Sequence, residues 1–199
     1  MNHPGTLLHT FTSITKPLRL GELFLKPHPM ELEIGCGDGG FLLGHAKTHP
    51  ERNFLGVERL LGRIRKLDKK GRRASLRNLR LLRIEARYLI EHLLPENTFD
   101  AIHIYFPDPW PKDKHTRHRL INKTFPGHAE RLLQPSGIIH LRTDSVPYFE
   151  QMQTVFPAHG AFKEEPTPAG LKARVTEFES EFNAQGIPTN HASWRLATS

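Results

Sequence analysis

A glycine-rich loop is the first segment whose residue types and spacing indicate chemistry. Residues 33–40 read Glu-Ile-Gly-Cys-Gly-Asp-Gly-Gly, and Gly35, Gly37 and Gly40 fit the G-x-G-x-x-G spacing of a nucleotide-binding turn. Glycines suit these positions because the backbone must turn tightly and approach a ligand closely. Cys36 lies inside the loop, where a small buried side chain is expected rather than a reactive thiol. The segment therefore predicts a cofactor-binding turn.

The acidic residues around this loop distinguish two possible cofactors. Glu33 and Asp38 would repel the pyrophosphate of a dinucleotide, whereas they would attract the sulfonium and ammonium groups of S-adenosylmethionine. Glu58 follows the next apolar run, where a carboxylate can accept hydrogen bonds from ribose hydroxyls of either cofactor. Glu85 follows the third run, at the place expected for an adenine edge. Acids at three successive strand ends favour S-adenosylmethionine.

A proline-rich segment is the second candidate for chemistry. Residues 105–112 read Tyr-Phe-Pro-Asp-Pro-Trp-Pro-Lys, and the three prolines stiffen the loop and stop the preceding strand. Asp108 and Trp110 are therefore expected to meet a base, the first by hydrogen bonding and the second by packing. For Trp110, burial in the core is an equal alternative, since tryptophan is often largely buried.

The charge distribution predicts a nucleic-acid partner. The chain has 28 Lys and Arg against 21 Asp and Glu, a net charge of +7. Eleven Lys or Arg residues and one acid, Asp68, lie between Arg59 and Arg83, and such a run repels itself unless an anion meets it. Five of these cations recur at helical spacing and form one expected exposed stripe: Arg59, Arg63, Lys66, Lys70 and Arg73. We expect Arg63, Lys66 and Lys70 to contact RNA phosphates.

These side chains need a scaffold, and the hydrophobic pattern supplies one. Apolar runs predict strands at residues 30–34, 53–57, 79–84, 99–106 and 137–142, with two final strands after Gly160 and an antiparallel edge there. Helices are expected at residues 40–48 and 116–133, and a third after the second strand with Leu60, Ile64 and Leu67 facing the sheet. Strands that alternate with helices predict an α/β, Rossmann-like, doubly wound, mostly parallel sheet with helices on both faces.

The domain plan and the cellular setting are simple. Residues 1–28, with four prolines in or beside them, are expected to form a mostly irregular, basic leader, and residues 29–199 a single domain. No apolar run is long enough to span a bilayer, and one cysteine cannot form an intrachain disulfide, so a cytoplasmic protein is expected. His115 and His118 are three residues apart and could share a helix face. No cysteine cluster or metal-binding motif accompanies them, so no metal is expected.

Four motifs in a fixed order resemble those of the bacterial tRNA (guanine-N7-)-methyltransferase family. Residues 33–37 with 56–58 are similar to the cofactor half of that family, and residues 106–112 are similar to its most distinctive segment. Thr-Asp at 143–144 and Thr-Glu-Phe-Glu at 176–179 are similar to its two further substrate motifs. The resemblance runs from about residue 30 to about residue 187.

The resemblance implies a seven-stranded Rossmann-like fold and methylation of a guanine in the tRNA variable loop, with S-adenosylmethionine as methyl donor. It places cofactor contacts on Glu33, Glu58, Glu85 and Asp108, beside Gly35 and Gly37 of the turn. It places substrate contacts on Lys112, Asp144, Thr176, Glu177, Phe178 and Glu179. The family usually has Asp at the position of Glu85, and its basic stretch after the tryptophan is usually denser. Whether the protein is a monomer or a homodimer is left open.

Guanine N7 carries a lone pair and no proton, so this methyl transfer needs alignment rather than a general base. Asp108 is the catalytic candidate, because a carboxylate near the base favours the positive charge that develops on it, and it can also accept hydrogen bonds from guanine N1 and N2. Three alternatives stay open at this point: a nicotinamide-dependent reductase, a methyltransferase that acts on an exocyclic amine, and a non-catalytic RNA-binding module.

Overall fold

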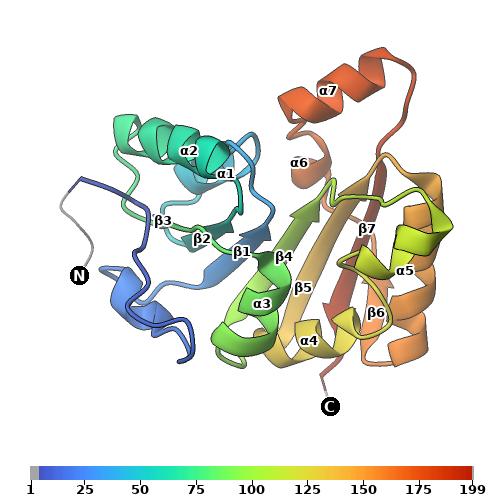
Figure 1. Ribbon diagram of the computed structural model, residues 1–199, viewed down its shortest axis with the longest axis horizontal. Helices are drawn as coiled ribbons and strands as arrows, with labels where there is room; N and C mark the ends of the chain where they lie inside the picture. Colours follow the sequence, from blue (N-terminus) through green and yellow to red (C-terminus); the bar gives the residue numbers. More distant parts are fainter. Residues whose placement is uncertain (1–4, 199) are drawn as a thin grey trace.

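One seven-stranded sheet forms the centre of the computed structural model, which describes residues 5–198 (Figure 1). Residues 1–4 of the leader and Ser199 lie outside that range. The strands are β1 (Met30–Ile34), β2 (Asn53–Val57), β3 (Leu79–Leu82), β4 (Phe99–Tyr105), β5 (Leu133–Thr143), β6 (Phe162–Glu165) and β7 (Asn190–Leu196), in the order β3-β2-β1-β4-β5-β7-β6. β1 to β5 pair in parallel, whereas β7 runs antiparallel to β5 and β6. The predicted fold class is confirmed.

Alternation along the strands gives the sheet one apolar face. Leu32 of β1 and Ile102 of β4 point into the larger core, together with side chains of three helices. These helices are α3 (Ala86–Tyr88), which continues as a π-helical turn over Leu89–Leu93, α4 (Phe125–Leu132) and α5 (Val146–His159). On the opposite face, α1 (Leu42–Thr48) and α2 (Leu61–Arg73) pack over β2 and β3 around a smaller core. Helices therefore cover both faces, as predicted.

The remaining part of that second face is polar. Glu31 and Glu33 of β1, His103 of β4, and His140 and Arg142 of β5 are all buried there, and the sheet register places Glu33 beside His103 and His103 beside His140. Two short helices, α6 (Ala169–Lys172) and α7 (Glu177–Ala184), lie above it (Figure 1). Buried polar residues of β1, β4 and β5 thus occupy positions that a parallel sheet covered on both faces would fill with apolar residues.

The prediction of one helix over residues 116–133 is wrong. A 3-10 turn spans Asp113–His118, and α4 begins only at Phe125, with a proline in its first turn. Between the 3-10 turn and α4, hydrogen bonds that involve side chains fix the chain in place of the backbone hydrogen bonds of a helix. Arg119 Nε donates to the carbonyl of Pro109 at 2.7 Å, and the Ile121 amide donates to the Tyr148 hydroxyl at 2.8 Å. These tertiary contacts override the local helical pattern.

The prediction for Leu60 is also wrong. Ile64 and Leu67 are buried against the sheet, but the side chain of Leu60 is 45% exposed. Leu60 precedes the first residue of α2 and has an extended backbone, so its side chain does not share the helix face. Its amide instead donates to Glu58 Oε1 at 2.6 Å.

Residues 5–28 are mostly irregular and pack on the domain. Leu7 belongs to the smaller core, whereas Leu20 and Leu23 of a 3-10 turn belong to the larger one. Leu8 forms a parallel bridge with Leu81, so the leader runs alongside β3. Across residues 5–198, the helices are all too short or too polar to cross a bilayer.

Candidate active site

A cavity of about 440 Å³ lies at the carboxyl ends of β1 to β4. That is the expected position for a ligand of an open α/β sheet, and the volume is within the usual range for small-molecule sites. Residues that are far apart in sequence meet there. The structure brings together Gly35, Glu58, Glu85, Asp108 and Trp110, all of which the sequence singled out.

The glycine loop has the backbone shape that the sequence predicts. Gly35 and Gly37 both have positive φ, +79° and +55°, in the left-handed region that disfavours residues with a side chain. The Gly35 and Cys36 amides each donate to the carbonyl of Val57 at 2.9 Å, which ties the loop to the end of β2. The loop therefore leaves β1 as a tight turn beside the cavity.

Glu58 connects the loop to α2. Its Oε2 accepts a hydrogen bond from the Gly37 amide at 3.2 Å, and its Oε1 accepts one from Leu60 at 2.6 Å. Each carboxylate oxygen has a second lone pair, so these bonds leave acceptors for ribose hydroxyls. The side chain is held in place from both sides before any ligand arrives.

Glu85 has a structural task that the sequence analysis did not predict. It is the N-cap of α3, and its two oxygens accept hydrogen bonds from the amides of Arg87 and Tyr88 at 3.0 and 2.8 Å. The first-turn amides of a helix need such acceptors. Glu85 still lines the cavity, so an adenine amine would compete for, or share, oxygens that already accept.

Glu33 is a buried acid of β1, two residues before Gly35, and it is not among the residues that line the cavity. It is 4% exposed, and its Oε2 has no hydrogen-bond partner among the described residues. Burial raises the pKa of Glu33 to about 8, although the nearby Arg142 opposes the shift. A buried acceptor without a partner costs stability. The ammonium of S-adenosylmethionine is the kind of group that would satisfy it.

Asp38, expected near the charged groups of the methyl donor, already contacts a cation of the protein itself. Its carboxylate forms an ion pair with Lys70 at 2.9 Å, and the Lys70 hydrogen bond lowers the pKa of Asp38. Asp38 therefore already has a cationic partner from α2. Lys70, expected to contact phosphate, is in turn partly neutralised.

The proline-rich loop is strained and held in one shape. Phe106 and Trp110, on either side of Asp108, have φ of +52° and +43°, a region that non-glycine residues rarely adopt. Such residues persist where the surrounding structure fixes them, commonly at functional sites. The Phe106 amide donates to the carbonyl of Arg142 at 2.9 Å, while the Asp108 side chain is exposed toward the cavity mouth.

Trp110 is not part of the core. Its side chain is 38% exposed, which contradicts the alternative of a buried tryptophan. The ring stacks on His115 at a centroid distance of 5.9 Å and packs at 5.2 Å against His118. Trp110 thus presents an aromatic surface that a base could contact.

The C-terminal motif at residues 176–179 proves to be partly structural. Thr176 and Glu179 form the capping box of α7, and Glu179 makes a buried ion pair with Arg142 at 2.8 Å. Phe178 is exposed, and its ring lies 5.0 Å from that of Phe106, so α7 sits against the proline-rich loop. The remaining predicted substrate residues are exposed or half-buried: Lys112, Asp144 and Glu177.

The five cations of the basic stripe are exposed, as predicted, but only four of them lie on α2; Arg59 precedes the helix, so its predicted place on the helical stripe is wrong. Arg63 also lines the cofactor cavity, together with Arg59 and Arg87, whose positions there the sequence analysis missed. Arg87 lies two residues after Glu85, a predicted cofactor residue, and this proximity was the only sequence signal that could have placed Arg87 at the cavity. Three arginines therefore line the same cavity as the carboxylates.

A strand order with one inserted antiparallel strand, an acid-lined glycine turn and a cavity above it define a Rossmann-like methyltransferase. A family model described as "Putative methyltransferase" matches residues 27–193. The chain is 35% identical to the tRNA (guanine-N(7)-)-methyltransferase of Nitrosococcus oceani, over 92% of this chain and 76% of that one. It is 36% identical to that of Enterococcus faecalis, over 83% and 79%. The chain belongs to the tRNA (guanine-N7-)-methyltransferase family.

Solved structures support the same fold. The chain resembles the 16S rRNA methyltransferase KamB with a TM-score of 0.64 at 15% identity, over 89% of this chain and 92% of that one. It resembles TrmN from Thermus thermophilus with a TM-score of 0.61 at 18% identity, over 89% and 46%. At these identities the likeness concerns the fold alone.

Proposed function

We propose that this enzyme transfers the methyl group of S-adenosylmethionine to N7 of a guanine in the variable loop of tRNA. The observation that carries the proposal is one cavity, at the strand ends of a chain in this family, whose lining includes Gly35 of the glycine turn and the acids Glu58, Glu85 and Asp108. Family membership removes the reductase and the non-catalytic module as alternatives. A cytoplasmic location and a single catalytic domain are parts of the same proposal.

The chemistry asks the protein mainly for position. The bond between sulfur and the methyl carbon breaks, its electron pair stays on sulfur, and the N7 lone pair forms the new bond, so no proton has to move at N7. Glu33 would hold the ammonium of the methyl donor and Glu58 its ribose. Asp108, on the stiff loop, would hold the Watson–Crick edge of guanine. Alignment of the two reactants in the cavity then supplies much of the rate.

Asp108 also explains base selection. A carboxylate can accept hydrogen bonds from both N1 and the N2 amine of guanine, while the corresponding edge of adenine offers no such pair. Positive charge grows on the base during transfer, so a fixed negative group nearby becomes more favourable in the transition state than in the ground state. Trp110 would pack against the same base, because its ring lies exposed two residues away.

The assignment predicts a specific cofactor and a specific product. S-adenosylmethionine and S-adenosylhomocysteine are expected to bind the purified protein, whereas NADH, with its pyrophosphate, is not. Incubation with unmodified tRNA should give 7-methylguanosine at a variable-loop position, read by nuclease digestion and mass mapping. A methyl group found on an exocyclic amine would show that the enzyme is the alternative kind of base methyltransferase. NADH binding in place of the methyl donor would refute the proposal.

The basic stripe predicts a salt effect. Replacing Arg63 and Lys66 by Ala should weaken tRNA binding and reduce the slope of log affinity against log salt by about two, near one per lost phosphate contact. Lys70 is left in place because it pairs with Asp38. A charge-matched control is Lys123→Ala with Lys163→Ala, since both are exposed and neither lines the cofactor cavity. Equal slopes in the two double variants would mean that the stripe holds no RNA.

A further inference from the structure

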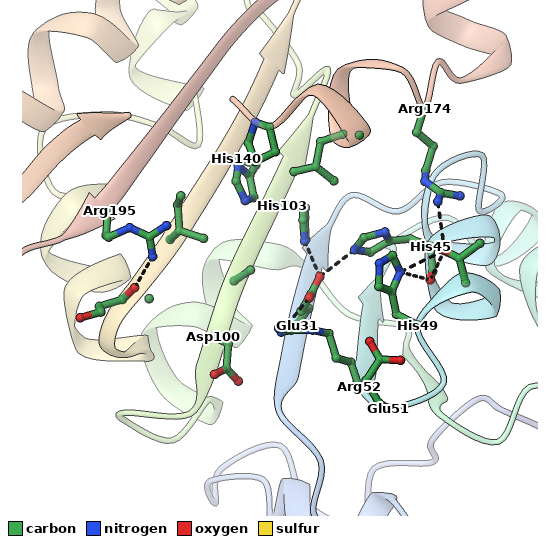
Figure 2. A pocket seen from close by; sticks show the side chains of 18 of the residues that line it. Glu31, His45, His49, Glu51, Arg52, Asp100, His103, His140, Arg174 and Arg195 are labelled. Carbon is green, nitrogen blue, oxygen red and sulfur yellow. Dashed lines mark hydrogen bonds and ion pairs between the residues drawn. The ribbon is translucent and has the colours of Figure 1, made fainter. Parts of the chain in front are cut away.

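A second, larger cavity lies on the polar part of the sheet face and plays no part in the proposed methyl transfer. Its volume is about 830 Å³, and it is lined by residues of β1, β4, β5, α1 and α6 (Figure 2). Four histidines line it: His45, His49, His103 and His140. The lining residues do not include any of the acids that face the cofactor cavity.

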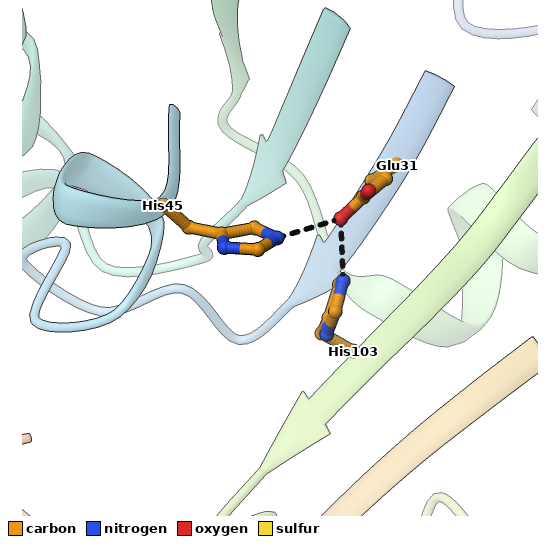
Figure 3. Close-up of side chains that lie close together, drawn as sticks. All are labelled: Glu31, His45 and His103. Atoms are coloured by element: carbon orange, nitrogen blue, oxygen red, sulfur yellow. Dashed lines mark hydrogen bonds and ion pairs between the residues drawn. The ribbon is translucent and has the colours of Figure 1, made fainter. Parts of the chain in front are cut away.

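Three side chains converge at one point of this cavity (Figure 3). Glu31 Oε2 lies 2.9 Å from His45 Nε2 and 2.8 Å from His103 Nε2. Glu31 and His45 are each 6% exposed, and His103 is 1% exposed. They come from β1, α1 and β4, so the fold assembles them from separate elements. Within the described residues, this is the group of His, Cys and acid side chains whose ligand atoms lie close enough to share an ion.

We propose that Glu31, His45 and His103 bind a divalent transition-metal ion of the zinc class. Two imidazole nitrogens and one carboxylate oxygen form the donor set of zinc sites with three protein ligands, and the adjoining cavity has room for a water as the fourth ligand. Ligand atoms around a tetrahedral zinc ion lie about 3.3 Å apart, given bonds of about 2.0–2.1 Å. The two oxygen–nitrogen distances would therefore have to widen by about 0.5 Å, which side-chain rotation can supply.

The hydrogen bonds around His103 tolerate the change, whereas the buried His45 Nδ1 has no hydrogen-bond partner among the described residues. Without an ion, each Nε2–H can donate to Glu31, and His103 Nδ1 then accepts from the Tyr105 hydroxyl at 2.8 Å. With an ion on Nε2, the proton sits on Nδ1, and the same hydroxyl becomes the acceptor. The tautomer shift moves protons within each ring and releases none. Arg52 Nη1 lies 3.1 Å from the other oxygen of Glu31 and fixes the orientation of the carboxylate.

The competing interpretation is a hydrogen-bonded brace, in which the two imidazoles and Arg52 merely satisfy a buried carboxylate. The sequence predicts no metal site, because His115 and His118 are three residues apart but have no recognisable further ligands beside them. His45 and His103 are separated from Glu31 by 14 and 72 residues, so their meeting is a tertiary result. Binding measurements distinguish the two interpretations.

The test uses the full chain without an affinity tag, first stripped with a chelator and then titrated with Co²⁺ or Zn²⁺. We expect one equivalent of Co²⁺ to produce visible ligand-field absorption, Zn²⁺ to displace it, and Zn²⁺ to raise the melting temperature, because an ion that binds only the folded state stabilises it. His45→Gln and His103→Gln should each weaken Zn²⁺ binding by about 100-fold or more, since even loss of an outer partner costs about 10–100-fold.

His49→Gln is the matched control, because His49 lines the same cavity and is not one of the three ligands. It should bind Zn²⁺ like the wild type. Binding of S-adenosylmethionine, measured for every variant, shows that each is folded. Absence of stoichiometric Co²⁺ and Zn²⁺ binding to the wild type would overturn the proposal. Unchanged Zn²⁺ affinity in both His45→Gln and His103→Gln would do the same and would favour the brace.

Discussion

Replacing Asp108 by Asn is expected to lower the rate of methyl transfer by about 100-fold or more, the usual effect of removing one preorganised electrostatic group. The variant keeps the shape of a loop that three prolines and two residues of positive φ hold in place. It removes the negative charge and replaces one acceptor oxygen with a donor, which opposes the N1 and N2 hydrogens of guanine. Single-turnover rates at saturating tRNA and S-adenosylmethionine measure the effect.

The affinity for tRNA should change little in Asp108→Asn, because phosphate contacts supply most of that affinity. Lys112→Ala makes an informative comparison. Lys112 is exposed four residues further along, and its loss should weaken tRNA binding more than the rate at saturation. Near-normal single-turnover rates for Asp108→Asn would show that Asp108 is not catalytic and that the loop mainly supports Trp110.

Glu33→Gln is expected to have opposite effects on binding and on stability. If Glu33 holds the ammonium of the methyl donor, the variant loses a charge-assisted hydrogen bond, and the affinity for S-adenosylmethionine should fall by about 10- to 100-fold. The same change removes a carboxylate that the folded protein ionises only with difficulty. The variant should therefore unfold at a higher denaturant concentration than the wild type above pH 8.

The sign of this pH effect follows from the pKa of Glu33. Burial raises that pKa from 4.5 to about 8, so the folded state binds more protons than the unfolded state between these values. Wild-type stability from this group is thus fully present below pH 4.5 and is lost as the pH rises to about 8. The stability difference between Glu33→Gln and the wild type should be small near pH 4.5 and should grow by a few kcal/mol, in order of magnitude, by pH 8. A difference that does not vary with pH would contradict the burial effect.

The sequence predicted the strands well because their signal is local. The apolar runs at residues 30–34 and 53–57 coincide with β1 and β2, and the glycine turn after β1 has the positive φ angles that its glycines indicate. Helix boundaries that depend on tertiary contacts were predicted less well. The residues between Arg119 and Thr124 have a helical pattern, but the Arg119 guanidinium donates to Pro109 and the Ile121 amide donates to Tyr148, partners that are 10 and 27 residues away.

The candidate site shows the same division. The residue types around the cavity could be read from sequence, because each acid follows a recognisable strand. Their additional tasks could not. Glu85 caps α3, and Asp38 is already paired with Lys70. The capping box of Thr176 and Glu179 could have been recognised, since the T-x-x-E spacing typifies a helix start.

The polar part of the second sheet face is also indicated by the sequence, although only the structure explains the pattern. Glu31 and Glu33 alternate with apolar residues in β1, and His140 and Arg142 do so in β5. A strand covered on both sides should be apolar throughout. Alternation of polar and apolar residues in central strands therefore indicated that one sheet face is not packed by apolar side chains. Which polar residues meet on that face depends on the strand order, which the alternation does not reveal.

The leader beside β3 has a consequence for how this protein behaves in concentrated solution. β3 is the last strand on its side of the sheet, and an uncovered outer strand offers free amides and carbonyls to another chain. Hydrogen bonds of Leu81 with Leu7 and His9 occupy part of that row. The opposite margin, β6, is only four residues long and carries Lys163, Glu164 and Glu165, which discourage strand addition. Residues 7–9 thus cover part of the outer strand and hinder self-association of the sheet, whether or not the leader contacts RNA.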